Sequence, residues 1–168
     1  MSREARWFWL VVLTCVLGAM AVHWDGFRTP DLGFASSRQA ELERISAWLE
    51  HHPGDVYAHI RRGDLWLERD NYEAAAADFR VALEAGCQDP TVLNNMAWSL
   101  AQLGRYEEAR PLAEQSVRSR REAYALDTLA VICASLDDHD RARELFAEAL
   151  RLEPDNEEIR NHRDALLP

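Results

Sequence analysis

The residues best suited to metal binding or catalysis occur in two short runs, the adjacent pair His51 and His52 and the run Asp137-Asp138-His139-Asp140. Adjacent side chains on a loop point apart, and no Cys or acidic cluster supplies further ligands for the histidine pair. The second run falls between two predicted helices, where Asp ordinarily caps a helix N-terminus, and it lacks the loop length and final Glu of a calcium-binding hand. We therefore predict no metal site and no cofactor.

The sequence also lacks the motifs that support catalysis. Cys15, Cys87 and Cys133 form no C-x-x-C pair, and no G-x-G-x-x-G, G-x-S-x-G or H-E-x-x-H motif occurs. The chain contains no Lys, which excludes a phosphate-binding lysine and Schiff-base chemistry. These absences predict a protein that is not an enzyme, has no catalytic residues and takes no small-molecule substrate.

Composition indicates one modest globular domain with an additional terminal segment. The chain has 168 residues, 48% hydrophobic and 29% charged, which is typical of a folded protein. The chain has 19 basic residues, all of them Arg, and 29 acidic residues, which gives a formal net charge of −10. This balance argues against a surface that binds nucleic acid or anionic lipid.

Residues 7–24 carry no Asp, Glu, Lys or Arg. As a helix, 18 residues at about 1.5 Å each span about 27 Å, enough for a thin bilayer. Arg3 and Arg6 precede the run and Trp residues lie near both its ends, as in a membrane anchor whose N-terminus is inside the cell. We therefore predict a transmembrane anchor over 1–24. The alternatives are a signal peptide cleaved near 19–21, a lipoprotein at Cys15 and a buried helix.

Residues 25–35 contain two Gly and a Pro without periodicity, and are predicted to be a linker. From Ser36 onward apolar residues recur at helical spacing, which predicts an all-α fold of about eight helices. The first of these, 36–52, opens with Ser36 and Gln39 at capping-box spacing.

The helical region repeats itself with a period near 34 residues, which indicates stacked helical hairpins. Each repeat contributes one member to each of four sets of corresponding positions. These are Gly63, Ala97 and Ala130; Tyr72, Tyr106 and His139; Ala75, Ala109 and Ala142; and Phe79, Ala113 and Phe146. The small residues predict close approach of neighbouring helices.

These residues resemble the signature of the tetratricopeptide repeat (TPR) family. The resemblance covers residues 53–154, as repeats of about 56–89, 90–122 and 123–154, with capping helices at 36–52 and 155–168. The fold class it implies is an all-α TPR helical-hairpin solenoid behind one N-terminal transmembrane helix. The first repeat departs from the pattern, because His59 and Arg62 stand where the family usually has large apolar residues, so its first helix is expected to pack loosely or to face a partner.

The resemblance further implies that the first helix of each repeat lines a concave groove that binds protein. Carried over to this sequence, the groove is expected to include Tyr57, Arg61, Asp64, Asn94, Asn95, Trp98, Tyr124 and Asp127. Such a mixture of aromatic, amide and charged side chains suits an extended peptide or a partner helix. Family members that grip a C-terminal carboxylate with Lys and Asn are not matched here, because Lys is absent.

Taken together, these features predict an adaptor or assembly factor, tethered to the inner membrane with its TPR domain in the periplasm, whose partner is a protein or peptide client. The bacterial location is inferred from the exclusive use of Arg over Lys, which suggests GC-rich coding. Two alternatives remain open: a permanent structural subunit of a membrane complex, and a TPR protein secreted after signal cleavage.

Overall fold

The computed structural model describes residues 34 to 167, and all regular structure in this range is helical. Eight helices follow one another: α2 (Phe34–His51), α3 (Val56–Leu67), α4 (Tyr72–Glu84), α5 (Pro90–Gln102), α6 (Tyr106–Ser119), α7 (Ala123–Ser135), α8 (His139–Leu152) and α9 (Glu157–Leu166). The chain divides into two units between Glu41 and Leu42, inside α2, and the second unit, Leu42–Pro168, is compact. The second unit contains the rest of α2 and all of α3 to α9. The all-α prediction is confirmed for the described residues.

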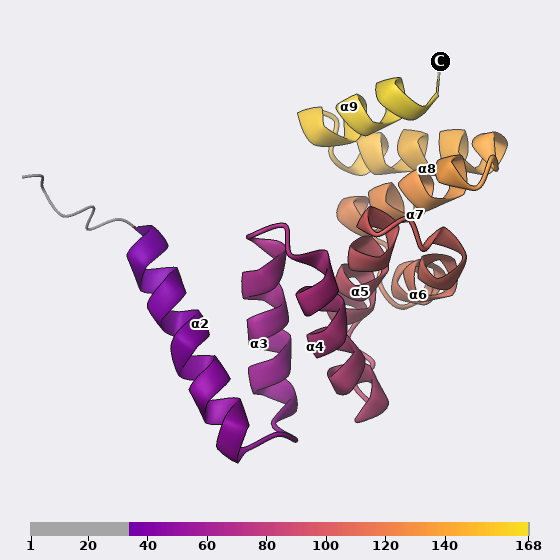
Figure 1. Cartoon of the computed structure of the whole chain (residues 1–168). Helices are drawn as coiled ribbons and strands as arrows, with labels where there is room; N and C mark the ends of the chain where they lie inside the picture. Colours follow the sequence, from indigo (N-terminus) through magenta and orange to yellow (C-terminus); the bar gives the residue numbers. More distant parts are fainter. Residues whose placement is uncertain (1–33, 168) are drawn as a thin grey trace, which may run out of the picture. The chain divides into compact units, whose positions relative to one another are not determined.

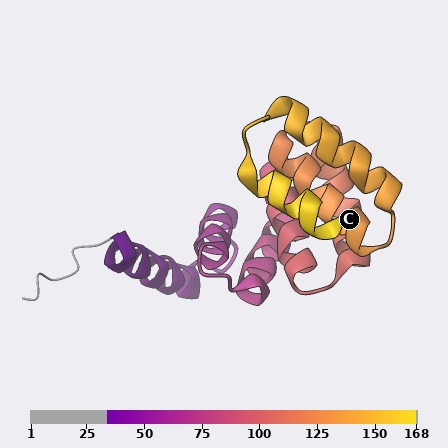
Figure 2. The same ribbon diagram turned by 90° about the horizontal axis from the view of Figure 1, so that it is seen from above.

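Helices α3 to α8 form three consecutive helical hairpins (Figure 1). Helices α3 and α4, α5 and α6, and α7 and α8 pair within the hairpins, while α4 packs on α5 and α6 on α7 between them. The first helices of the hairpins and α9 begin at intervals of 33 or 34 residues. Helix α9 therefore stands in the register of the first helix of a fourth repeat, and it packs against α7 and α8 (Figure 2).

Small residues allow the close helix packing that the repeat pattern predicts. Ala97 and Ala130 are fully buried, and Gly63 is buried at the corresponding place on α3. A Cβ atom added to Gly63 would lie 2.7 Å from Cε1 of Phe79, a contact too short for any side chain. A side chain at position 63 would therefore force the Phe79 ring to shift.

The turn within each hairpin has the same backbone geometry. Asp70, Gly104 and Asp137 occupy corresponding places after α3, α5 and α7, with φ angles of 54°, 73° and 62°. Helices commonly end in this left-handed conformation, which glycine adopts freely and Asp tolerates better than most residues. The recurring turn shows that the repeat extends to the backbone between the helices.

Asp and Asn cap several of the helices, although not always at the residue the sequence predicts. The predicted terminal helix, 155–168, begins at Glu157, and Asn156 caps it by accepting a hydrogen bond from the backbone N–H of Ile159 at 3.2 Å. Asp138 stands at the N-terminus of α8, but its carboxylate accepts from Arg110 and makes no cap hydrogen bond. Helix α2 begins at Phe34, so the prediction that Ser36 opens it is wrong.

The polar residues of the first repeat form an internal cluster, contrary to the expectation of loose packing or an external partner. Asp78 on α4 is 3% exposed and accepts two hydrogen bonds from Arg62, from Nε at 2.8 Å and from Nη2 at 2.7 Å. His59 is also buried, with Nδ1 2.7 Å from Asp78 and Nε2 3.0 Å from the carbonyl oxygen of Pro53. The three side chains therefore join α3 to α4 where other repeats use apolar contacts.

The predicted membrane anchor, residues 7–24, lies outside the residues that the structure describes, as does nearly all of the predicted linker. Between residues 34 and 167, no helix combines the length and apolar character that a membrane crossing requires.

Candidate binding groove

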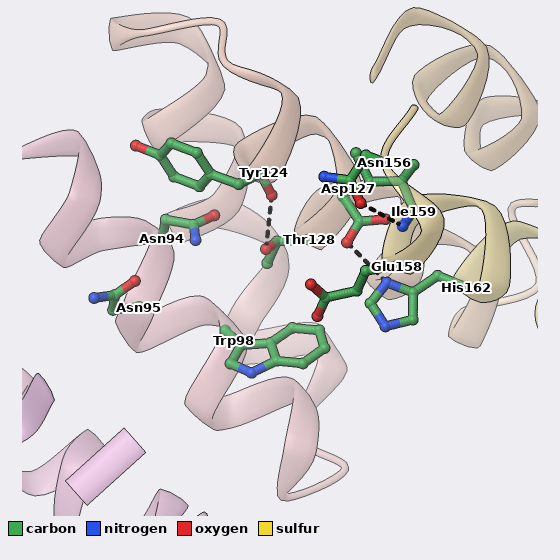
Figure 3. A pocket seen from close by; sticks show the side chains of 10 residues that line it. All are labelled: Asn94, Asn95, Trp98, Tyr124, Asp127, Thr128, Asn156, Glu158, Ile159 and His162. Carbon is green, nitrogen blue, oxygen red and sulfur yellow. Dashed lines mark hydrogen bonds and ion pairs between the residues drawn. The ribbon is translucent and has the colours of Figure 1, made fainter. Parts of the chain in front are cut away.

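A pocket of about 240 Å³ opens between α5, α7 and α9 (Figure 3). Helix α5 contributes Asn94, Asn95 and Trp98, and α7 contributes Tyr124, Asp127 and Thr128, while Asn156, Glu158, Ile159 and His162 come from α9 and its N-cap. Five of the eight predicted groove residues therefore lie together in one pocket. First helices of successive repeats meet here because the hairpins stack in register.

Two polar side chains in this pocket are buried without satisfying all their hydrogen-bonding groups. Asn94 is 5% exposed and Asp127 is 7% exposed, and the Oδ1 atom of each has no hydrogen-bond partner. Most buried polar atoms in folded proteins have a partner, because an unpaired one loses its hydration without compensation. The two unpaired acceptor oxygens therefore make this pocket the candidate binding site.

His162 of α9 connects the two repeats that form the pocket. Its Nδ1 atom lies 2.8 Å from Oδ2 of Asp127, and its ring centroid lies 5.8 Å from that of Trp98 at an interplanar angle of 39°. This spacing is within the range of tilted aromatic contacts. His162 therefore holds one oxygen of Asp127 and one edge of Trp98 in place, and leaves the other carboxylate oxygen unpaired.

The electrostatic environment of Asp127 disfavours its negative charge. Burial raises the pKa of Asp127, the nearby His162 lowers it, and the negative charge of Glu158 raises it further, with a net increase. Glu158 itself is exposed at the edge of the pocket. His162 is the one residue with a basic side chain among those lining the pocket, so the site as a whole favours a positively charged group.

The remaining predicted residues, on α3, lie outside this pocket. Asp64 accepts a hydrogen bond from Nδ2 of Asn95 at 3.2 Å, which connects the first helices of the first two repeats. Burial raises the pKa of Asp64, while the bond from Asn95 and the charge of Arg61 oppose that shift. Tyr57 is 77% exposed. The groove thus consists of an α3–α5 section joined to the pocket through Asn95.

The sequence analysis predicts residues 155–168 only as a capping helix, so it does not predict that α9 contributes to the groove. The useful signal is the repeat period: continued for one more unit, it places α9 in the register of a first helix, the class of helix that lines the groove. Ile159, 2% exposed, anchors α9 and thereby places Asn156, Glu158 and His162 beside Asp127.

The described residues hold no cluster suited to a metal ion, and the thiol of Cys133 is poorly suited to catalysis. Between residues 34 and 167, no three His, Cys, Asp or Glu side chains are grouped so that they could hold a metal ion. Cys133 is 1% exposed, and burial raises the pKa of its thiol. A buried thiol with a raised pKa is a poor nucleophile.

Sequence comparison identifies the repeats. Two family models, both described as tetratricopeptide repeat, match residues 42–90 and 90–155. This chain is built from tetratricopeptide repeats. Proteins of this family are generally non-catalytic interaction modules. A comparison with curated protein sequences found no match.

Solved structures of other proteins share the fold at low sequence identity. YrrB, described as a TPR protein with an unusual peptide-binding site, is 19% identical with a TM-score of 0.66, over 74% of this chain and 65% of YrrB. A MamA structure is 12% identical with a TM-score of 0.66, over 71% of this chain and 66% of MamA. The chain thus spans just under two thirds of these two proteins.

A third similar structure contains a ligand. The second TPR domain of human RPAP3, in complex with the HSP70 peptide SGPTIEEVD, is 20% identical with a TM-score of 0.59. The match covers 66% of this chain and 92% of that domain. Related folds therefore bind peptides.

Proposed function

We propose that this TPR protein is a non-enzymatic adaptor or assembly factor that holds a client peptide or helix in the groove formed by α3, α5, α7 and α9. The observation that carries the proposal is the pocket at Trp98 and Asp127, where buried acceptor oxygens lack partners beside a partly exposed aromatic surface. YrrB and RPAP3 support it as TPR folds with peptide sites. The RPAP3 peptide is acidic, whereas the pocket here contains Asp127 and Glu158, so a different peptide chemistry is expected.

Replacing Trp98 and Asn95 together with Ala is expected to abolish client capture. Trp98 offers flat apolar area of the kind that dominates binding energy, and the Asn95 amide can donate to and accept from a peptide backbone. Both are only partly buried, so the fold should survive. The measurement is in-cell crosslinking followed by purification of the full-length chain, with circular dichroism as the check on folding.

Trp48→Ala provides a matched control, because Trp48 on α2 is 49% exposed and does not line the pocket. A partner that is enriched with the wild-type chain and with Trp48→Ala, and lost with the double variant, supports the groove. A partner that persists with the double variant places binding on another surface and overturns the proposal.

We further propose that residues 7–24 anchor the adaptor in the inner membrane, with the TPR domain in the periplasm. The support is the uncharged run itself, flanked by Arg3 and Arg6 on one side and bordered by Trp residues. Confinement to the membrane raises the effective concentration of the groove near a membrane-associated client, so that a weak interaction becomes productive.

The anchor predicts that the mature protein retains its N-terminus and stays with the membrane after alkaline carbonate extraction. Intact mass spectrometry of the purified protein shows whether the N-terminus is retained. Protease digestion of spheroplasts shows on which side of the membrane the TPR domain lies. A mass that lacks the first 21 or so residues shows a cleaved signal peptide. Protection of the TPR domain in intact spheroplasts would place it in the cytoplasm.

A further inference from the structure

The unpaired oxygen of Asp127 indicates which hydrogen-bonding groups a ligand of this pocket should carry. Oδ2 of Asp127 is held by His162 at 2.8 Å, while Oδ1 is buried and has no partner. Oδ1 of Asn94, from the neighbouring repeat, is unpaired in the same pocket. Both atoms are acceptors, so the missing group must donate hydrogen bonds.

The charges around the pocket specify the sign of that group. Asp127 and Glu158 are acidic, and no Arg is among the lining residues. Glu158 also adds to the cost of ionising Asp127, and burial raises the pKa of Asp127 in the same direction. A cationic donor would relieve both effects, whereas an anionic group would increase them.

The size and aromatic lining of the pocket favour a planar side chain. Its volume of about 240 Å³ lies below the roughly 300–1,000 Å³ of sites for drug-sized molecules. Trp98 and Tyr124 line it, as Figure 3 shows. A guanidinium group stacks on aromatic faces and carries several N–H donors in one plane, so it can reach two acceptors at once.

We propose that the pocket between α5, α7 and α9 binds an arginine side chain of the client peptide, with its guanidinium pairing with the carboxylate of Asp127 and lying beside Trp98. This proposal rests on the proposed function, and it assigns the groove a preference for basic client segments. Glu158, at the edge of the pocket, attracts the cation as it enters.

Three short capped peptides that differ only at their central residue test this preference. The central residue is arginine, its uncharged analogue citrulline, or glutamate, and binding to the full-length chain is followed by NMR through the indole N–H signal of Trp98. We expect the arginine peptide to shift this signal and to bind about tenfold or more tightly than the citrulline peptide, since a charge-assisted hydrogen bond is lost. The glutamate peptide should not bind.

Asp127→Asn tests the assigned residue without changing its size. An Asn side chain keeps an oxygen that His162 can bond but loses the charge, so the variant should stay folded while binding arginine and citrulline peptides alike. Asp140→Asn is the matched control: its side chain is fully exposed on α8, and the variant has the same change in net charge. This control should keep the arginine preference.

Several results would overturn the proposal: equal binding of the arginine and citrulline peptides to the wild type, an arginine preference that survives in Asp127→Asn, or no response of Trp98 to the arginine peptide. These failures are distinct from failure of the proposed function. Client capture that depends on Trp98 and Asn95, with no preference for arginine, leaves the adaptor function standing and removes only the basic specificity.

Discussion

Replacing Asp78 with Ala is expected to lower the free energy of unfolding by about 3–5 kcal/mol, because it leaves the charge of Arg62 without its partner in a largely buried setting. Arg62 makes two hydrogen bonds to Asp78, and its side chain is 23% exposed. The hydrogen bond to Asp78 is the main factor that raises the pKa of Arg62, and burial opposes it. His59 loses the same partner. Urea denaturation followed by circular dichroism measures the loss.

Two further variants separate a buried network from an ordinary ion pair. Asp140→Ala removes a fully exposed carboxylate that pairs with Arg143, and should change the free energy of unfolding far less than Asp78→Ala does. Replacing His59, Arg62 and Asp78 together with apolar residues should recover most of the stability, since buried ion pairs are often no better than well-packed apolar groups. A loss below about 1 kcal/mol in Asp78→Ala would show that the three-residue network contributes little.

Phe79→Ala is expected to cost a similar amount, about 3–5 kcal/mol, because it opens a cavity in the core of the first hairpin. Phe79 is fully buried, and its ring lies against the backbone of Gly63. A change on the other side of this contact, Gly63→Ala, adds volume instead of removing it. It should cost about 1–3 kcal/mol, since the new Cβ would lie 2.7 Å from the ring. Both losses are measured by denaturant unfolding.

The double variant Gly63→Ala with Phe79→Ala tests whether the two residues act as one contact. With the ring removed, the added methyl group meets no obstacle, so the double variant should lose less than the sum of the two single losses. Gly54→Ala is the control, because nothing lies within 4 Å of an added Cβ there, and its effect should stay within about 0.5 kcal/mol. Additive losses would show that Gly63 and Phe79 stabilise the hairpin independently.

The departures from the sequence predictions have a common cause, which the first repeat illustrates. The period near 34 residues placed His59 and Arg62 correctly in register, but their polarity suggested an open or partner-facing helix. Their shared partner, Asp78, belongs to the next helix and has no special position in the repeat pattern. A buried polar group is stable only with its partner, and that partner is known only once the helices are packed.

The groove residues likewise show what the repeat register predicts and what only the packing of the helices decides. Register alone placed Asn94, Asn95, Trp98, Tyr124 and Asp127 on first helices, and the structure brings these five into one pocket. It does not bring Tyr57, Arg61 and Asp64 there, because the α3–α5 contact through Asn95 lies in a separate section. It adds His162, which the sequence alone left on a terminal cap.

The sequence by itself determined the all-helical class, the three hairpins and the helix faces that pack, since apolar period and small-residue spacing act locally along each helix. Tertiary structure decided which polar groups are paired. Packing of α4 on α3 gave His59 and Arg62 a partner in Asp78, whereas packing of α9 on α7 held one oxygen of Asp127 and left the other buried and unpaired. Hydrogen bonding depends on short distances between atoms far apart in the chain, and only the folded arrangement sets those distances.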